Sequence, residues 1–277
     1  MKFVFIAVNY NGAAHTENYL QSLQEMTLPD GDTLEAIIVD NNSLDSDLEK
    51  VRSSVAQRPF ARLIAQDHNP GYFRGLNAGI DTCPKTEGTL LVVGNNDLKF
   101  AMDFIIRLKE IPYEKDVLVI APNITTLDGR RQNPHVVKNV PYSELVMTRI
   151  YFTNYYIGQA GRLINRTIRS LLRRVRPAPK NVRPKPEPGR MKIKRGIGAC
   201  YVLTPYFFHH YQRLDGRVFL WGEEALLSHQ VESAGGCTLY DPSIKILHHE
   251  SASVKSIESR KRYEIVKASY KIYRDYL

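Results

Sequence analysis

Residues 2–12 read KFVFIAVNYNG, an apolar run that ends in a polar turn containing a glycine. An apolar run followed directly by polar residues recurs at 34–43 (LEAIIVDNNS) and at 89–97 (TLLVVGNND). Apolar runs of this length are typical of strands that are buried on both faces of a parallel sheet. Helical patterns separate them along the chain, so the sequence predicts an α/β fold in which helices flank a mixed, mostly parallel sheet.

Further elements extend this pattern along the chain. Strands are also predicted at 61–66, 116–122, 198–205, 237–241 and 243–250. Helices are predicted at 16–24, 45–57, 73–81, 102–110 and 223–234, in much of 142–175, and at the C-terminal end. A Pro-rich stretch at 177–188 predicts an extended connection between the two halves of the sheet.

Polar residues follow three of the predicted strands at the point where each strand ends. They are Asn9 to Gly12, Asp40 to Ser43 and Asn95 to Asp97. Ligands of parallel sheets bind at the carboxyl ends of the strands, so these residues predict a site at one edge. The sequence lacks the GxGxxG loop of dinucleotide-binding proteins and the GxxxxGKS/T loop of P-loop NTPases, which disfavours both classes.

The composition is that of a globular protein. Of 277 residues, 43% are apolar and 24% are charged, which excludes disordered, collagen-like and coiled-coil chains. The three cysteines, Cys83, Cys200 and Cys237, form no CxxC pair, which argues against a disulfide framework and fits a reducing compartment. The apolar run at 3–8 is too short for a signal peptide or a membrane span. We therefore expect a cytoplasmic protein or one that lies on a membrane surface.

Positive charge is concentrated in one segment. Residues 161–195 contain thirteen Lys/Arg and one acid, whereas the rest of the chain, with 25 basic and 28 acidic residues, is mildly acidic. On a helix, five arginines would form one stripe and an Ile/Leu stripe would lie opposite, as in helices that bind anionic membrane surfaces. The stripe consists of Arg162, Arg166, Arg169, Arg173 and Arg176. The alternative is a surface helix with a solvated face. We do not expect this basic segment to bind nucleic acid, because it lacks interleaved aromatic residues and any known binding motif.

Seven motifs, read in order, give the chain a family resemblance. They are NYNG, VDNNS, NPGYFRGLNAGI, GNND, RGIGACYVLTP, FLWGEE and ILHHESAS. The chain resembles the family 2 glycosyltransferases over residues 1–135 and 195–253, in particular the rhamnosyltransferase-like branch that builds bacterial surface polysaccharides such as O-antigen. The resemblance implies a Rossmann-like GT-A fold and a metal-dependent, inverting enzyme. It would use a nucleotide diphosphate-sugar donor and a lipid-linked or polysaccharide acceptor at the cytoplasmic membrane face.

The resemblance divides the chain into four parts. Residues 1–140 would form the nucleotide-sugar-binding half of the GT-A domain, and 196–253 the acceptor and catalytic half. Residues 141–195 would form the basic helical insert with its Pro-rich connection, and 254–277 a C-terminal helix.

The resemblance assigns the first motifs to the donor. Asp40 would contact the nucleotide, the NYNG segment would line the same pocket, and the segment around Arg74 would lie near the diphosphate. The structural alternative for Asp40 is a cap on the helix that begins near Asp45. The residues assigned to the nucleotide-sugar are Asn9, Tyr10, Asn11, Gly12, Asp40, Asn42, Gly71, Arg74, Asn77 and Asn96.

The GNND motif stands where the family carries its metal-binding DxD motif. Asp97 would supply a carboxylate to Mg²⁺ or Mn²⁺, and Asn95 replaces the Asp that many relatives carry. His248, in preference to His249, would approach the metal. With one protein carboxylate, the cation should depend on the donor phosphates. The structural alternative is a simple turn after the strand.

WGEE matches the family's catalytic ED motif at the start of a helix. Glu224 would act as the general base that deprotonates the acceptor hydroxyl, with Glu223 as its neighbour. Adjacent carboxylates repel each other, which can raise the pKa of one of them. The structural alternative is that both glutamates stand in the first turn only because the helix dipole favours negative charge there.

Two other classes of protein remain as alternatives. A nucleotidyltransferase would need a glycine-rich phosphate loop after the first strand, which is missing. A catalytically inactive, membrane-docked assembly protein would not need carboxylates at Asp97 and Glu224.

Overall fold

The computed structural model describes residues 1–156, 158–159, 187–250 and 258–277. The strands are β1 (Lys2–Asn9), β2 (Thr33–Asp40), β3 (Ala61–Ala65), β4 (Thr89–Asn95), β5 (Leu98–Phe100), β6 (Val117–Thr126), β7 (Met191–Ile193), β8 (Cys200–Leu203) and β9 (Cys237–His248). The helices are α1 (Ala13–Gln24), α2 (Asp45–Ala56), α3 (Tyr72–Ile80), α4 (Phe104–Lys109), α5 (Tyr142–Tyr151), α7 (Pro205–His210), α8 (Glu223–Ser233), α9 (Ser259–Tyr273) and the 3-10 helix η2 (Arg274–Tyr276). The five arginines of the predicted membrane stripe lie outside these ranges.

The strands form one mixed sheet, as predicted. Their order is β3-β2-β1-β4-β8-β6-β9-β5, and β7 pairs with β9. β1 runs parallel to both β2 and β4, with Asn9 opposite Asp40 and Val8 opposite Asn95. The carboxyl ends of these three strands therefore meet at one edge. β8 pairs antiparallel with β4 and β6, so the second half of the chain completes the sheet begun by the first.

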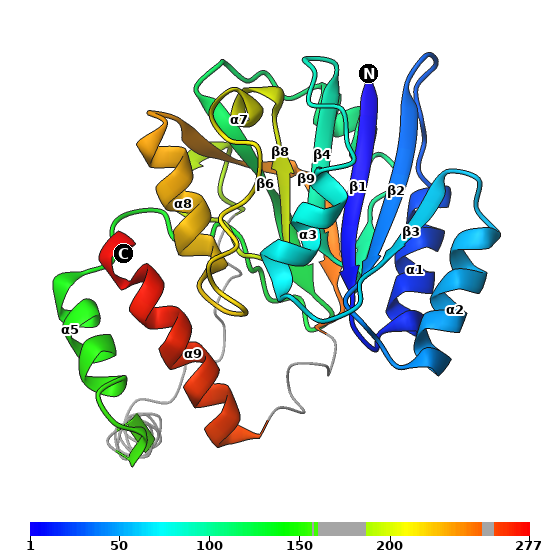
Figure 1. Cartoon of the computed structure of the whole chain (residues 1–277). Helices are drawn as coiled ribbons and strands as arrows, with labels where there is room; N and C mark the ends of the chain where they lie inside the picture. Colours follow the sequence, from blue (N-terminus) through cyan, green and yellow to red (C-terminus); the bar gives the residue numbers. More distant parts are fainter. Residues whose placement is uncertain (157, 160–186, 251–257) are drawn as a thin grey trace, which may run out of the picture.

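Helices cover both faces of the sheet (Figure 1). Successive side chains of β1 point to opposite faces. Phe3 and Phe5 join a buried cluster with α1, α2 and α4. Val4 and Ile6 join a second cluster with α3, α7 and α8. Burial on both faces explains why this strand is apolar without alternation.

Several elements differ from the prediction. The two strands expected at 237–241 and 243–250 form the single strand β9, which bulges where the backbone N–H of Ser243 donates to Oδ1 of Asp241 (2.8 Å). α7 follows β8 directly, with Pro205 in its first turn, where proline is tolerated because its missing N–H would have no partner. β5 and β7 have three residues each, too few to show a sequence pattern.

The C-terminal helix α9 lies beside α5 (Figure 1), and aromatic side chains join the two. Phe152 stacks on Tyr270 with ring centroids 4.6 Å apart, and the hydroxyl of Tyr263 donates to the carbonyl of Tyr151 (3.2 Å). η2 then returns to α8, where Tyr276 stacks on His229 at 3.9 Å. α9 thus bridges α5 and α8.

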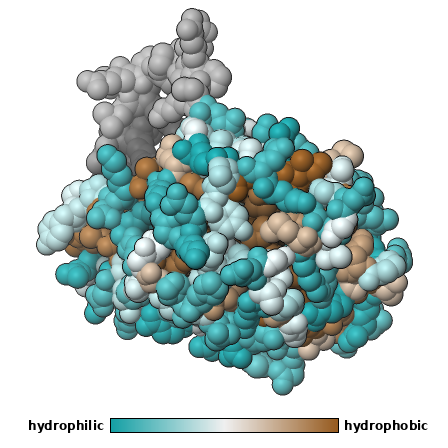
Figure 2. Space-filling model, turned by 90° about the horizontal axis from the view of Figure 1, so that it is seen from above, coloured by the Kyte–Doolittle hydropathy of each residue, from teal (hydrophilic) through white to brown (hydrophobic). Residues whose placement is uncertain are grey.

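The end of the molecule that carries the start of β1 is largely hydrophilic, with hydrophobic residues in small separate groups (Figure 2). The polar strand ends described below lie at the opposite edge of the sheet. Within the described ranges, no helix combines the length and the apolarity needed to cross a bilayer.

Candidate active site

Asn9 joins the three strand ends into one polar cluster. It is fully buried, and its Nδ2 lies 2.7 Å from Oδ1 of Asp40 and 3.0 Å from Oδ2 of Asp47. Its Oδ1 accepts hydrogen bonds from the Thr16 hydroxyl (3.0 Å) and from Nδ2 of Asn96 (2.9 Å). The predicted convergence of polar residues at this edge is therefore present in the structure.

Asp40 lies behind the surface of this edge. Its side chain is fully buried, and its oxygens accept from the backbone N–H (2.9 Å) and the hydroxyl (2.6 Å) of Ser43 as well as from Asn9. These contacts fix the turn between β2 and α2. The placement favours a positioning role for Asp40 over direct contact with a nucleotide.

Three other residues assigned to the nucleotide-sugar form the exposed part of the edge. Tyr10 is 46% exposed, and Asn11 and Asn42 adopt left-handed backbone conformations with φ of 53° and 61°. Asn11 also joins the two loops, because its Oδ1 accepts from the backbone N–H of Leu44 (2.9 Å). These side chains are accessible to a ligand that approaches the strand ends.

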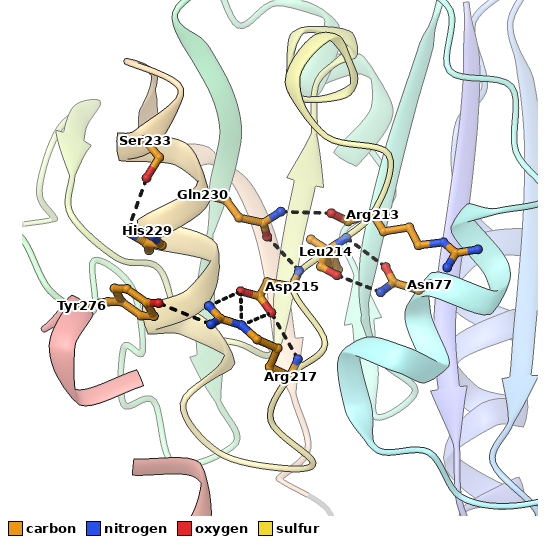
Figure 3. A network of polar contacts seen from close by, with 9 residues as sticks. All are labelled: Asn77, Arg213, Leu214, Asp215, Arg217, His229, Gln230, Ser233 and Tyr276. Carbon is orange, nitrogen blue, oxygen red and sulfur yellow. Dashed lines mark hydrogen bonds and ion pairs between the residues drawn. The ribbon is translucent and has the colours of Figure 1, made fainter. Parts of the chain in front are cut away.

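Arg74 and Asn77 hold a loop, whereas the resemblance places them near the diphosphate. The amide of Asn77 pairs with the backbone of Leu214, donating at 2.8 Å and accepting at 2.9 Å (Figure 3). Arg74 Nε donates to the carbonyl of Gly216 (2.7 Å). Gly71 has φ of 98°, and a Cβ there would lie 2.4 Å from the carbonyl oxygen of Phe219. This segment therefore supports residues 213–219 in the structure.

The same loop is held from α8 and from the C-terminus (Figure 3). Gln230 Oε1 accepts from the backbone N–H of Asp215 (2.8 Å), and its Nε2 donates to the carbonyl of Arg213 (3.0 Å). Arg217 pairs with Asp215 and donates to the Tyr276 hydroxyl (3.3 Å). No sequence motif marked Gln230 or Tyr276, because their partners are distant in sequence.

α9 packs against the turn that presents the two glutamates. Trp221 and Gly222 both have left-handed backbones, with φ of 65° and 100°, and a Cβ on Gly222 would lie 2.2 Å from the Tyr273 ring. Arg262 lies over the Trp221 ring at 5.2 Å, and the Ser269 hydroxyl donates to the carbonyl before Trp221 (2.8 Å). The C-terminal helix therefore fixes the start of α8, a role that sequence reasoning missed.

Glu223 and Glu224 occupy different environments at the start of α8. Glu223 is 4% exposed, and among the described residues its Oε1 has no hydrogen-bond partner. Burial and, after it, the charge of Glu224 raise the pKa of Glu223 to about 8. Glu224 is half-buried, and its Oε1 accepts from the backbone N–H of Gly198 (3.2 Å). Glu224 is thus the more accessible carboxylate of the pair.

The buried Glu223 predicts a pH-dependent stability. Folding raises the pKa of Glu223, so as pH rises the unfolded chain loses this proton at a lower pH than the folded chain does. The free energy of unfolding therefore falls between about pH 4.5 and 8. Each pKa unit of displacement corresponds to about 1.4 kcal/mol. Glu223→Gln should remove this pH dependence. The free energy of unfolding of the variant, measured relative to that of wild type, should therefore be higher at pH 8 than at pH 5.

Urea unfolding of wild type, Glu223→Gln and the control Glu224→Gln at both pH values measures this difference. A stability difference between wild type and Glu223→Gln that is the same at pH 5 and pH 8 would contradict the assignment.

The residues predicted to hold metal lie together at the ends of β4 and β9. His248 Nε2 is 3.1 Å from Oδ1 of Asp97 and 3.5 Å from Nδ2 of Asn95. The pairing of β5 with β9 creates this contact, since Leu98 lies opposite His248. Side chains of Asp97 and His248 are 4% and 11% exposed.

The donor set fits a divalent cation that is shared with a ligand. A carboxylate oxygen and an imidazole nitrogen suit Mn²⁺, and an Asn oxygen suits either Mn²⁺ or Mg²⁺. In the part of the chain that the structure describes, no group of three or more His, Cys, Asp or Glu is placed to bind metal. The remaining ligands would come from donor phosphates and water.

Tyr72 lies near both the predicted metal residues and the glutamate pair. Its hydroxyl donates to the carbonyl of Gly198 (2.8 Å), next to Glu224. Burial raises the pKa of Tyr72 well above its ordinary value, and neighbouring charges that include Glu223 and Asp97 raise it further. The end of β4 reaches the same segment, because the backbone N–H of Asn95 donates to the carbonyl of Ala199 (2.9 Å), so the two motifs are neighbours in space.

Comparison with known proteins gives the family and the fold of the chain. The family model described as "Glycosyl transferase family 2" matches residues 4–174. Similar solved structures include GalNAc-T7 with UDP, GalNAc and Mn²⁺ (TM-score 0.58, 15% identity, 96% of this chain and 47% of that chain). TarS 1–349 of S. aureus (TM-score 0.55, 12% identity, 99% and 73%) is another. A third is the mannosyltransferase PcManGT from Pyrobaculum calidifontis in complex with GDP-Man and Mn²⁺ (TM-score 0.55, 14% identity, 97% and 69%).

The chain spans about half the length of the GalNAc-T7 chain and about seven-tenths of the other two. No curated protein sequence matches it significantly. At these low identities the solved structures show a shared fold, whereas the family model covers more than half of the sequence. The chain belongs to glycosyl transferase family 2 and has the GT-A fold.

Proposed function

We propose that the protein is a metal-dependent, inverting glycosyltransferase. It would transfer a sugar, for which the sequence resemblance favours rhamnose, from a nucleotide diphosphate-sugar to a hydroxyl of a lipid-linked or polysaccharide acceptor. The observation that carries the proposal is the proximity of the two motifs. The backbone N–H of Asn95 donates to the carbonyl of Ala199 (2.9 Å), and the N–H of the adjacent Gly198 donates to Glu224 (3.2 Å). The UDP, GDP-Man and Mn²⁺ named for the similar structures support this class of donor and metal.

Each carboxylate has a separate task in this proposal. Asp97 and His248, with Asn95, would hold Mg²⁺ or Mn²⁺, which supplies charge neutralisation for the diphosphate leaving group. Glu224, held by the Gly198 N–H, would accept the proton of the attacking acceptor hydroxyl. Glu223, neutral because of its raised pKa, adds no second negative charge beside this base at neutral pH.

A donor panel tests the activity. The full chain is incubated with UDP-, dTDP- and GDP-sugars in Mn²⁺, and sugar release or transfer is followed by NMR, which also reports the configuration at the anomeric carbon. We expect release from one class of donor, with inverted configuration. Retained configuration would contradict the inverting mechanism, and tight donor binding without any release would favour an inactive assembly protein.

We also propose that the protein acts at the cytoplasmic membrane face, on the basis of the arginine stripe in its sequence. Replacing Arg162, Arg166, Arg169 and Arg173 with Glu should release the protein from anionic vesicles, because each basic residue near such a surface contributes about 1 kcal/mol. Cosedimentation at low and high salt measures this, with neutral vesicles as the control. Equal pelleting of wild type and variant would refute the role of the stripe.

A further inference from the structure

His248 contacts a second residue that no motif identified. Its Nδ1 lies 2.7 Å from Oε1 of Gln132, while its Nε2 faces Oδ1 of Asp97 at 3.1 Å. An imidazole nitrogen can donate a hydrogen bond only when it carries the proton, so the ring's tautomer depends on what Gln132 presents to Nδ1.

Glu250 determines which way the amide of Gln132 points. Nε2 of Gln132 lies 2.9 Å from Oε1 of Glu250, and Arg130 Nη2 donates to the same oxygen at 2.6 Å. A carboxylate that pairs with Arg only accepts hydrogen bonds, so the amide nitrogen must face Glu250 and the amide oxygen must face His248. The amide oxygen of Gln132 therefore accepts a proton carried by Nδ1, while Nε2 faces Oδ1 of Asp97.

The backbone holds Gln132 and Arg130 in place for these contacts. The N–H of Gln132 donates to the carbonyl of Ile124 (2.8 Å), and the N–H of Thr126 donates to the carbonyl of Arg130 (2.9 Å). This hairpin continues β6 and brings both side chains beside the end of β9. The contacts from Glu250 through Gln132 to His248 thus join residues whose backbones are held at the ends of β6 and β9.

We propose that Gln132, oriented by Glu250 and Arg130, is a positioning residue that directs Nε2 of His248 toward Asp97 and the divalent cation. The proposal rests on the metal dependence of the proposed function. Histidines that bind metals usually donate their other N–H to a fixed acceptor, and loss of that acceptor typically weakens metal affinity about 10–100-fold. Gln132→Met, which keeps the volume and removes the acceptor, should lose Mn²⁺ affinity by about this factor.

An exchange of the two side chains provides a rescue. In the double variant Gln132→Glu/Glu250→Gln, a carboxylate at 132 accepts from His248 Nδ1 and from the new amide at 250, so the order of donors and acceptors is kept. We expect it to recover most of the Mn²⁺ affinity. Gln57→Met, at an exposed position at the end of α2, is the matched control for the Met substitution and should bind as wild type does.

Two measurements on the full chain test the proposal. EPR titration of Mn²⁺ in the presence of UDP, dTDP or GDP gives the metal affinity. ¹⁵N NMR of labelled histidine, with Mg²⁺ and the same nucleotide and also without metal, shows whether Nδ1 carries a proton, and His248→Ala identifies the signal. The expected result is a proton on Nδ1 of His248 in wild type and in the double variant, and loss of this preference in Gln132→Met. An unchanged tautomer and an unchanged Mn²⁺ affinity in Gln132→Met would overturn the proposal.

The outcomes also separate this proposal from the proposed function. If wild type binds no Mn²⁺ with any of the three nucleotides, the metal dependence fails. In that case, a change of tautomer in Gln132→Met would still support the control of His248 by Gln132. Thermal unfolding of Gln132→Met close to that of wild type shows that neither result comes from a loss of folding.

Discussion

Glu224→Gln is expected to lower kcat by about 10²–10⁴-fold, the usual contribution of a general base, with donor affinity close to that of wild type. Glutamine keeps the size of the side chain, and its amide oxygen can still accept the hydrogen bond from Gly198 (3.2 Å in wild type). It cannot take a proton from the acceptor hydroxyl. Initial-rate measurements at saturating donor, together with donor titration by calorimetry, separate the two effects.

Glu223→Gln is the matched control for this substitution. Since burial raises the pKa of Glu223 to about 8, the residue is already neutral at pH 7, and an amide imitates its neutral form. We expect a much smaller loss of kcat. An inactive Glu223→Gln together with an active Glu224→Gln would assign the general base to Glu223. Full activity of both variants would refute the assignment of this motif.

Asp97→Asn should weaken metal-dependent binding of the donor by about two orders of magnitude. Loss of a group that only orients a metal ligand costs about 10–100-fold, so loss of a direct carboxylate ligand should reach at least the upper end of that range. The fold should survive, because Asn has the same shape and the backbone carbonyl of Asp97 still accepts from the N–H of His249 (3.0 Å).

Calorimetric titration of nucleoside diphosphate in Mn²⁺ and in EDTA measures this effect. Asp103→Asn, at an exposed carboxylate that pairs with Arg107 on α4, is the control and should bind as wild type does. Equal affinity of Asp97→Asn and wild type in Mn²⁺ would refute the metal assignment.

The centre of the sheet was predictable because burial acts on every residue of its strands. β1, β2 and β4 each contain an uninterrupted apolar run, and their polar ends had to meet once the strands were parallel. β5 and β7 were not predictable, because three residues carry no period, and they form only where β9 offers a partner. The bulge in β9 likewise depends on Asp241 capping its own turn.

The location of the candidate residues was predictable where a side chain belongs to a strand end or to the start of a helix. Asp97, Glu223 and Glu224 lie where their motifs placed them. Asn77 and Arg74 were assigned to the donor because a helix N-terminus favours phosphate, yet in the structure they bind backbone atoms of a loop far along the chain. A contact with backbone atoms cannot be read from a sequence pattern, because every residue carries the same backbone atoms.

The supporting residues around the site were missed for the same reason. Gln132 acts through an amide whose orientation depends on Glu250, and Tyr273 through its packing on Gly222. Neither residue type is unusual where it stands. Only the pairing of β9 with β5 and β6, and the return of α9 to α8, brings these side chains to the site.

The central claim is that this edge of the sheet binds a nucleoside diphosphate through a divalent cation. Thermal unfolding with UDP, dTDP or GDP, in Mn²⁺ and in EDTA, tests it most directly, because a ligand that binds only the folded protein raises its Tm. We predict that one of the three raises the Tm in Mn²⁺, that EDTA abolishes the rise, and that Asp97→Asn shows none. No rise with any nucleotide in Mn²⁺, or an equal rise in EDTA, would contradict the claim.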